Sequence, residues 1–81
     1  MLSDNERRAM WAAQAADTFG LITFCGRTFS RLAIEEPEEA NDLLGDLMCD
    51  ILHLAHQHGW DAQNLLVRAK LHFEEELRED E

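Results

Sequence analysis

Residues 37–58 read PEEANDLLGDLMCDILHLAHQH, and this stretch decides the fold. Its apolar residues recur at the spacing of one face of an α-helix. That face consists of Leu43, Leu44, Leu47, Met48, Ile51, Leu54 and Ala55. Pro37 suits the first turn of a helix, where its missing N–H would have no partner, and Glu38 and Glu39 complement the positive end of the helix dipole. The pattern predicts an amphipathic helix over about residues 37–58.

The residues that follow indicate a turn and another helix. Gly59 can adopt the left-handed conformation that ends helices, and Asp61 can cap the next one. The apolar face of the segment after this turn consists of Leu65, Leu66, Ala69 and Phe73. We expect a helix over about residues 61–77 that packs antiparallel on the helix at 37–58, with residues 74–81 as a fraying acidic end.

The N-terminal third also carries a helical pattern. Ser3 and Glu6 have the spacing of a capping box, so a helix begins near residue 4. Apolar residues then recur with a period close to 3.6, which predicts one helix over about residues 4–33. Gly20 and Gly26 weaken a helix interior, and residues 21–25 favour a strand. A break near residues 20–26 and a short β-hairpin within residues 20–33 are therefore alternatives.

The predicted fold is all-α, with residues 1–81 as a single domain. It is a small antiparallel helical bundle or helical hairpin with a long or kinked first helix. An unbroken helix over residues 4–33 would be about 45 Å long, against about 30 Å for the helix at 37–58. The excess cannot be covered within one chain, and a domain of 81 residues has only a small core. We therefore expect a homodimer, with an interface formed by Trp11, Phe19, Ile22 and Phe29.

The charge balance limits the partners. The chain has 17 acidic and seven basic residues, a formal net charge of −10. Such a surface repels phosphate backbones and anionic lipids, so we expect neither direct nucleic-acid binding nor membrane binding. No apolar stretch approaches the roughly 20 residues that cross a bilayer. The surplus of acids favours solubility and would suit a basic protein partner.

The cysteines and the first residues indicate the compartment. Cys25 and Cys49 are too far apart for a CxxC motif, and two cysteines alone make no zinc pattern, so we expect reduced thiols. Residues 1–10 carry charges where a secretory leader needs an apolar run. The sequence thus predicts a cytoplasmic location.

One cluster has the spacing of metal ligands. Asp46, Cys49, Asp50 and His53 share one side of the helix at 37–58. A carboxylate three residues before a histidine can bind one ion, as Asp50 and His53 could, with Asp46 as a third ligand. The same side is the polar side of the helix, so a solvated surface is the alternative. No nucleophile elbow or phosphate-binding glycine loop accompanies these residues.

The second half of the chain carries a family resemblance. Residues 44–55 (LGDLMCDILHLA), residues 59–61 (GWD) and the segment from 65 to 73 resemble the C-terminal half of MazG-like all-α nucleoside triphosphate pyrophosphohydrolases. The resemblance covers about the last 40 residues and implies a helical oligomer whose acidic side chains hold magnesium against a triphosphate. It implies metal ligands among Glu35, Glu36, Glu39, Asp46 and Asp50. The same segment resembles small helical proteins of proteobacterial and phage genomes, which implies no activity.

The chain departs from the metal motif of that family, which pairs EExxE with ExxD on two helices. Leu43, three residues before Asp46, occupies the position of the glutamate in ExxD. Only six residues separate Glu39 from Asp46, too few for the two antiparallel helices of the family. We therefore expect a non-enzymatic helical interaction or accessory protein without a cofactor. One alternative is a reduced MazG-like, magnesium-dependent pyrophosphohydrolase. The other is an acidic inhibitor of the phage type that mimics nucleic acid toward a basic protein.

Overall fold

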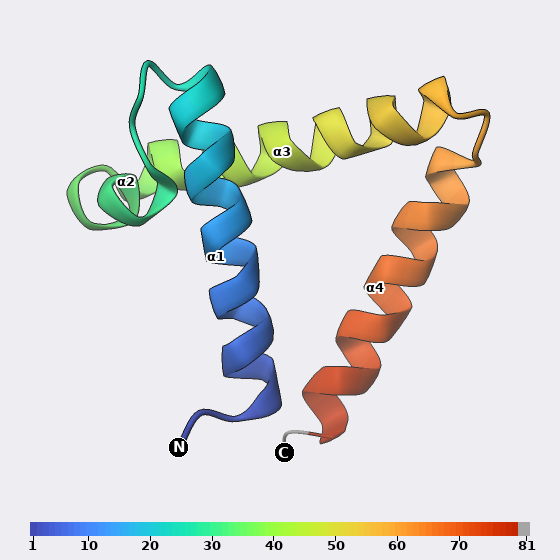
Figure 1. Ribbon diagram of the computed structural model, residues 1–81. Helices are drawn as coiled ribbons and strands as arrows, with labels where there is room; N and C mark the ends of the chain where they lie inside the picture. The colour runs from blue at the N-terminus through green and yellow to red at the C-terminus, as the bar shows by residue number, and fades with distance from the viewer. Residues whose placement is uncertain (80–81) are drawn as a thin grey trace.

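The structure is a computed structural model that describes residues 1–79, a range that contains helices and no strand. The all-α prediction is therefore confirmed. The helices are α1 (Asp4–Thr23), α2 (Phe29–Glu35), α3 (Pro37–Gln57) and α4 (Ala62–Glu79). The long helix α3 crosses the molecule, and α1 and α4 extend from it toward the same side, so that the start of α1 and the far end of α4 lie near each other (Figure 1).

The predicted helix ends are largely those of the structure. Ser3 and Glu6 form the capping box of α1: the Glu6 N–H donates to Ser3 Oγ over 3.1 Å, and the Ser3 N–H donates to Glu6 Oε1 over 3.3 Å. Pro37 lies in the first turn of α3. Gly59 has a φ of 75°, the left-handed conformation expected after α3. Local sequence signals therefore placed these ends correctly.

The single helix expected over residues 4–33 is wrong, because the chain turns between Thr23 and Phe29. Cys25 and Gly26 have φ values of 53° and 76°, which reverse the chain direction. Thr28 then caps α2 by accepting a hydrogen bond from the Arg31 N–H over 3.2 Å. The break lies at one of the positions that the glycines indicated. The β-hairpin alternative for residues 20–33 is also wrong, since this segment contains no strand.

Gly20 allows the returning chain to lie directly against α1. A Cβ atom at this buried position would overlap the carbonyl oxygen of Arg27 and approach Leu43 Cδ1 to 3.1 Å. Asp17, one turn earlier, accepts hydrogen bonds from the Ser30 N–H (2.7 Å) and the Ser30 hydroxyl (2.9 Å). The break therefore folds α2 back onto α1.

The core lies where α1, α2 and the first half of α3 meet. Its buried residues are Ala16, Leu32, Ala40 and Leu43. Partly buried side chains packed around them are Phe19, Phe24, Phe29, Leu44 and Leu47. This core therefore covers the apolar face of α3 only as far as Leu47.

The helix α4 does not pack along α3, so the predicted antiparallel pair is wrong. The two helices diverge from their connecting turn, and the far end of α4 returns toward the start of α1 (Figure 1). There Arg8 Nε lies 2.6 Å from Glu76 Oε2, and Asn5 Nδ2 donates to the Glu76 carbonyl over 2.9 Å. These polar contacts join the far end of α4 to the start of α1. Part of the segment expected to fray belongs to α4, which extends to Glu79, and residues 80–81 lie outside the described residues.

The substitution Gly20→Ala should destabilise the fold by about 1–3 kcal/mol, because the added methyl group overlaps backbone that cannot move freely. The control is Gly45→Ala in α3, where no atom lies within 4 Å of the new Cβ. That change should stabilise by about 0.5–1 kcal/mol, since alanine favours a helix interior. Urea unfolding followed by circular dichroism measures both. Equal effects at the two glycines would contradict the close packing at Gly20.

Candidate interaction surface

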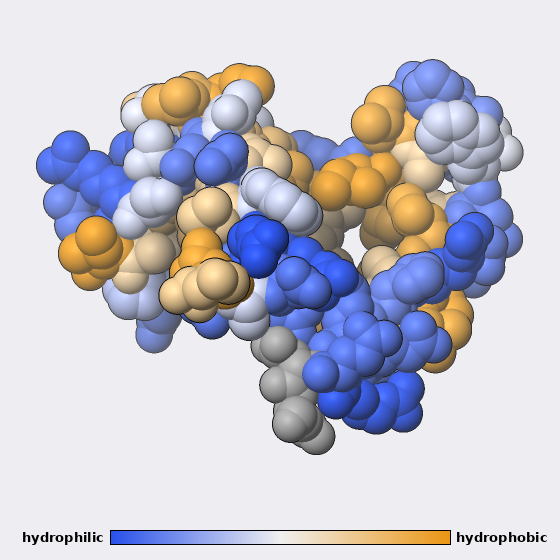
Figure 2. All heavy atoms as spheres, turned by 60° about the horizontal axis from the view of Figure 1, so that its bottom comes forward, coloured by the Kyte–Doolittle hydropathy of each residue, from blue (hydrophilic) through white to orange (hydrophobic). Residues whose placement is uncertain are grey.

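An exposed apolar groove lies between the second half of α3 and the first two-thirds of α4, and we call it the α3–α4 groove. It contains two adjoining hollows of about 450 and 160 Å³. Their lining residues are Met48, Ile51, Leu52, Leu65, Leu66, Ala69, Lys70 and Phe73. Figure 2 shows hydrophobic side chains on both sides of an opening between the body of the molecule and α4. The groove is therefore apolar and open to solvent.

Each wall of the groove continues a helical stripe that the sequence predicted. On α3 the stripe changes from partly buried at Leu47 to exposed at Met48 and Ile51. On α4 no residue is buried, and Phe73 keeps 59% of its surface exposed. The two stripes were expected to cover each other. Because α4 diverges from α3, both stay open along the groove.

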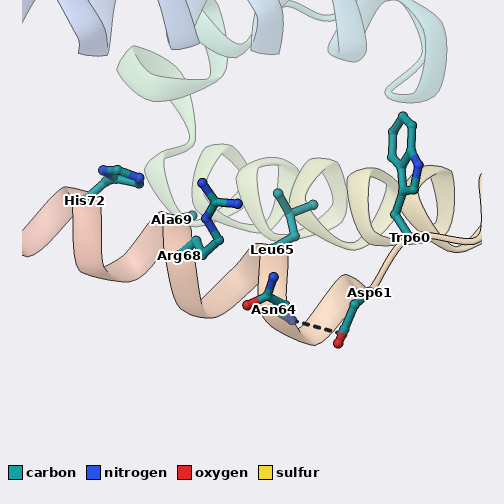
Figure 3. A pocket seen from close by; sticks show the side chains of 7 residues that line it. All are labelled: Trp60, Asp61, Asn64, Leu65, Arg68, Ala69 and His72. Atoms are coloured by element: carbon teal, nitrogen blue, oxygen red, sulfur yellow. Dashed lines mark hydrogen bonds between the residues drawn. The ribbon is translucent and has the colours of Figure 1, made fainter.

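A third hollow, of about 450 Å³, lies at the edge of the α4 stripe. Trp60, Leu65, Arg68 and His72 line it and point to the same side of α4 (Figure 3). Trp60 is exposed and stacks on His58, with ring centroids 4.6 Å apart and an angle of 17° between the planes. Tryptophan and arginine are frequent among the residues that dominate protein interfaces. This hollow extends the exposed apolar surface past the rim of the groove.

Asp61 sets where α4 begins and therefore positions one wall of the groove. Its carboxylate accepts a hydrogen bond from the Asn64 N–H over 3.0 Å (Figure 3). The Leu65 N–H donates to the Asp61 carbonyl over 3.1 Å, which closes the first turn of α4. Asp61 is thus the cap that the sequence predicted.

The predicted interface residues divide into two groups. Phe19 and Phe29 are partly buried and pack against the core, because the break after Thr23 folds α2 onto α1. Trp11 and Ile22 stay exposed, at 61% and 77% of their surface. The four residues therefore do not form one continuous stripe.

The glutamates of the predicted metal set face arginines. Arg27 forms ion pairs with Glu36 and, over 3.3 Å, with Glu39. Glu35 pairs with Arg31 over 3.1 Å. The hydrogen bond with Glu36 raises the pKa of Arg27 above its ordinary value; partial desolvation opposes this effect, and the negative charges of the glutamates add to it. These carboxylates already have cationic partners within the chain.

Asp46, Asp50 and His53 lie exposed on α3, away from those glutamates. Asp46 lies seven positions after Glu39, which corresponds to about 10 Å along a helix axis. Within residues 1–79, no three His, Cys, Asp or Glu side chains are gathered as a metal ion would require. The structure therefore does not bring the predicted metal ligands together.

The comparisons with known proteins return no relative. No protein-family model, curated protein or solved structure matches this chain. The resemblance of residues 44–73 to MazG-like pyrophosphohydrolases thus stays a prediction. None of the helices in residues 1–79 combines the length and the hydropathy of a membrane span.

Replacing Asp61 by alanine should weaken the start of α4 by about 1 kcal/mol, because the Asn64 N–H loses its acceptor. The matched control is Asp61→Asn, whose amide oxygen can still accept this bond. NMR secondary chemical shifts of residues 62–66 measure the helical population. A population that falls equally in both variants would contradict the capping role.

Proposed function

We propose that this protein is a non-enzymatic helical interaction protein that binds another protein chain through the α3–α4 groove. One observation carries the proposal: α4 buries no residue within the chain. Its exposed large apolar residues are Leu65, Leu66, Val67, Leu71, Phe73 and Leu77. Ordering a helix opposes folding through conformational entropy, and helices in proteins are stabilised chiefly by burying an apolar face. A molecule that covers α4 would provide that burial.

The shape and chemistry of the groove suit a helix as the bound element. Both walls are themselves helices, and their side chains recur at helical spacing. A helix with an apolar stripe can lie in such a groove and anchor residues one turn apart. Lys70 lies at the edge of the groove and Arg68 at the edge of the neighbouring hollow. Acidic residues beside the apolar stripe of the bound helix would complement these two cations.

The charge of the chain supports a protein partner over a phosphate-bearing one. A net charge of −10 repels nucleic acid and anionic membranes. The proposal includes a cytoplasmic location, which is supported by two cysteines that are both free thiols.

A non-catalytic role is supported by the arrangement of the acids. The glutamates nearest the start of α3 pair with Arg27 and Arg31, whereas Asp46 and Asp50 are exposed along α3. Magnesium-dependent phosphoryl chemistry needs several carboxylates converging on one ion. The described carboxylates do not converge in this way.

Incubation with a panel of nucleoside triphosphates and Mg²⁺ tests this proposal against its enzymatic alternative. We expect no pyrophosphate release above the buffer rate. The control is the double variant Glu39→Gln/Asp46→Asn, which removes two of the acids that the MazG-like resemblance implies. Release by the native chain that disappears in this variant would overturn the non-enzymatic proposal.

A further inference from the structure

We infer that the occupant of the α3–α4 groove is the α4 helix of a second copy of this chain, lying antiparallel to the first α4. Each copy then places its α4 in the groove of the other, around a two-fold axis. The inference rests on the proposed function and names the partner for the same surface.

The exposed area of the chain is that of half a dimer. Its accessible surface is 6528 Å², whereas a compact monomer of 9.3 kDa exposes about 5,000 Å². The excess is about 1,500 Å² per chain. Interfaces of obligate homodimers bury about 1,000–2,500 Å² per partner, and a standard stable interface buries about 800 Å². The surplus surface of this chain is therefore the amount that a stable homodimer removes from water.

The dimensions of the molecule lead to the same conclusion. Its radius of gyration is 14.0 Å, against about 12 Å for a compact chain of this length. Its extents are 39, 32 and 18 Å. The chain is therefore more open than a compact domain of its length, and a second copy in the groove would fill part of the open space.

The stripe on α4 is complementary to itself when two copies run antiparallel. Its seam consists of Ala62, Leu66, Ala69, Phe73 and Leu77, spaced by three or four residues as in helices that pack along their length. A crossing point near Ala69 places Leu66 opposite Phe73 of the other copy, and small Ala62 opposite large Leu77. The small side chain of Ala69 lets the two helices approach closely where they cross. A parallel pair would instead bring identical large residues together.

The distribution of charge on α4 also favours the antiparallel arrangement. Residues 73–79 contain four glutamates and one arginine, whereas residues 62–72 contain no acidic residue. An antiparallel pair places the two acidic ends at opposite ends of the pair, while a parallel pair would set them side by side. The helix dipoles are also opposed in an antiparallel pair. Repulsion between more distant acids is screened beyond about 10 Å in ordinary buffer.

The second α4 would cover the exposed wall of α3 as well. Met48 and Ile51 lie on that wall, and both are exposed in the single chain. Two α3 and two α4 helices would then enclose one apolar core, in the manner of a four-helix bundle. The dimer would thus complete the antiparallel helix packing that a single chain lacks.

Sedimentation equilibrium of the native chain and of two matched variants tests the inference. We expect a dimer at micromolar concentration. Phe73→Glu, at a position 59% exposed in the groove, should weaken the dimer by about a hundred-fold or more, because the symmetric interface contains the charge twice. Val67→Glu, at a position 56% exposed on another face of α4, should change the dissociation constant of the dimer by no more than a few-fold. Circular dichroism of both variants verifies that each still folds.

Two sedimentation results would overturn the inference. One is a native chain that stays monomeric at all concentrations. The other is a dimer that Val67→Glu abolishes and Phe73→Glu does not. Pyrophosphate release bears on the proposed function alone, so a monomer without turnover would overturn the homodimer and leave the interaction role in place.

Disulfide cross-linking tests the orientation. In a chain carrying Cys25→Ser and Cys49→Ser, Ala69→Cys should give a disulfide-linked dimer on oxidation, because the crossing point brings the two cysteines together. Leu77→Cys in the same background should not, because residue 77 would lie opposite residue 62 of the other copy. The two cysteines at position 77 would then be about 22 Å apart along the helix axis. Cross-linking at both positions would overturn the antiparallel arrangement.

Discussion

The apolar stripe of α3 extends beyond the surfaces that one chain packs against it, and the rest of the structure depends on this constraint. The turn after Thr23 brings α1 and α2 together over the half of the stripe that ends at Leu47. The close approach at Gly20 makes that arrangement possible. The other half would need α4, but Arg8 and Asn5 bind its far end at Glu76. The chain therefore has a packed core between α1, α2 and the first half of α3, and an open apolar groove between the second half of α3 and α4.

The sequence predicted the features that depend on neighbouring residues. The capping box at Ser3, the first turn at Pro37 and the turn at Gly59 follow from local chemistry, and all three lie where predicted. It did not predict the direction of α4, because the far end of α4 contacts residues that are distant in the sequence, as Arg8 and Glu76 are, 68 positions apart. Hydrophobic periodicity identifies the face of a helix that needs cover but does not identify what covers it.

The same limit applies to the candidate sites. Spacing correctly placed Asp46, Asp50 and His53 on one polar side of α3. It could not show that Arg27, nine residues before Glu36, would turn back and pair with that glutamate. In the same way, the apolar spacing that joined Phe19 with Phe29 assumed a helix without a break. Because the chain breaks after Thr23, the proposed interaction surface lies on α3 and α4. The sequence had predicted that the apolar faces of these two helices cover each other.

Amide hydrogen exchange at several protein concentrations tests most directly whether α4 depends on a second molecule for its cover. Within one chain α4 buries nothing, while α1, α2 and the first half of α3 share a core. We expect the amides of residues 62–79 to exchange rapidly in dilute solution and to become protected as concentration rises, with the core amides protected throughout. Protection of α4 that is strong and independent of concentration would contradict this dependence.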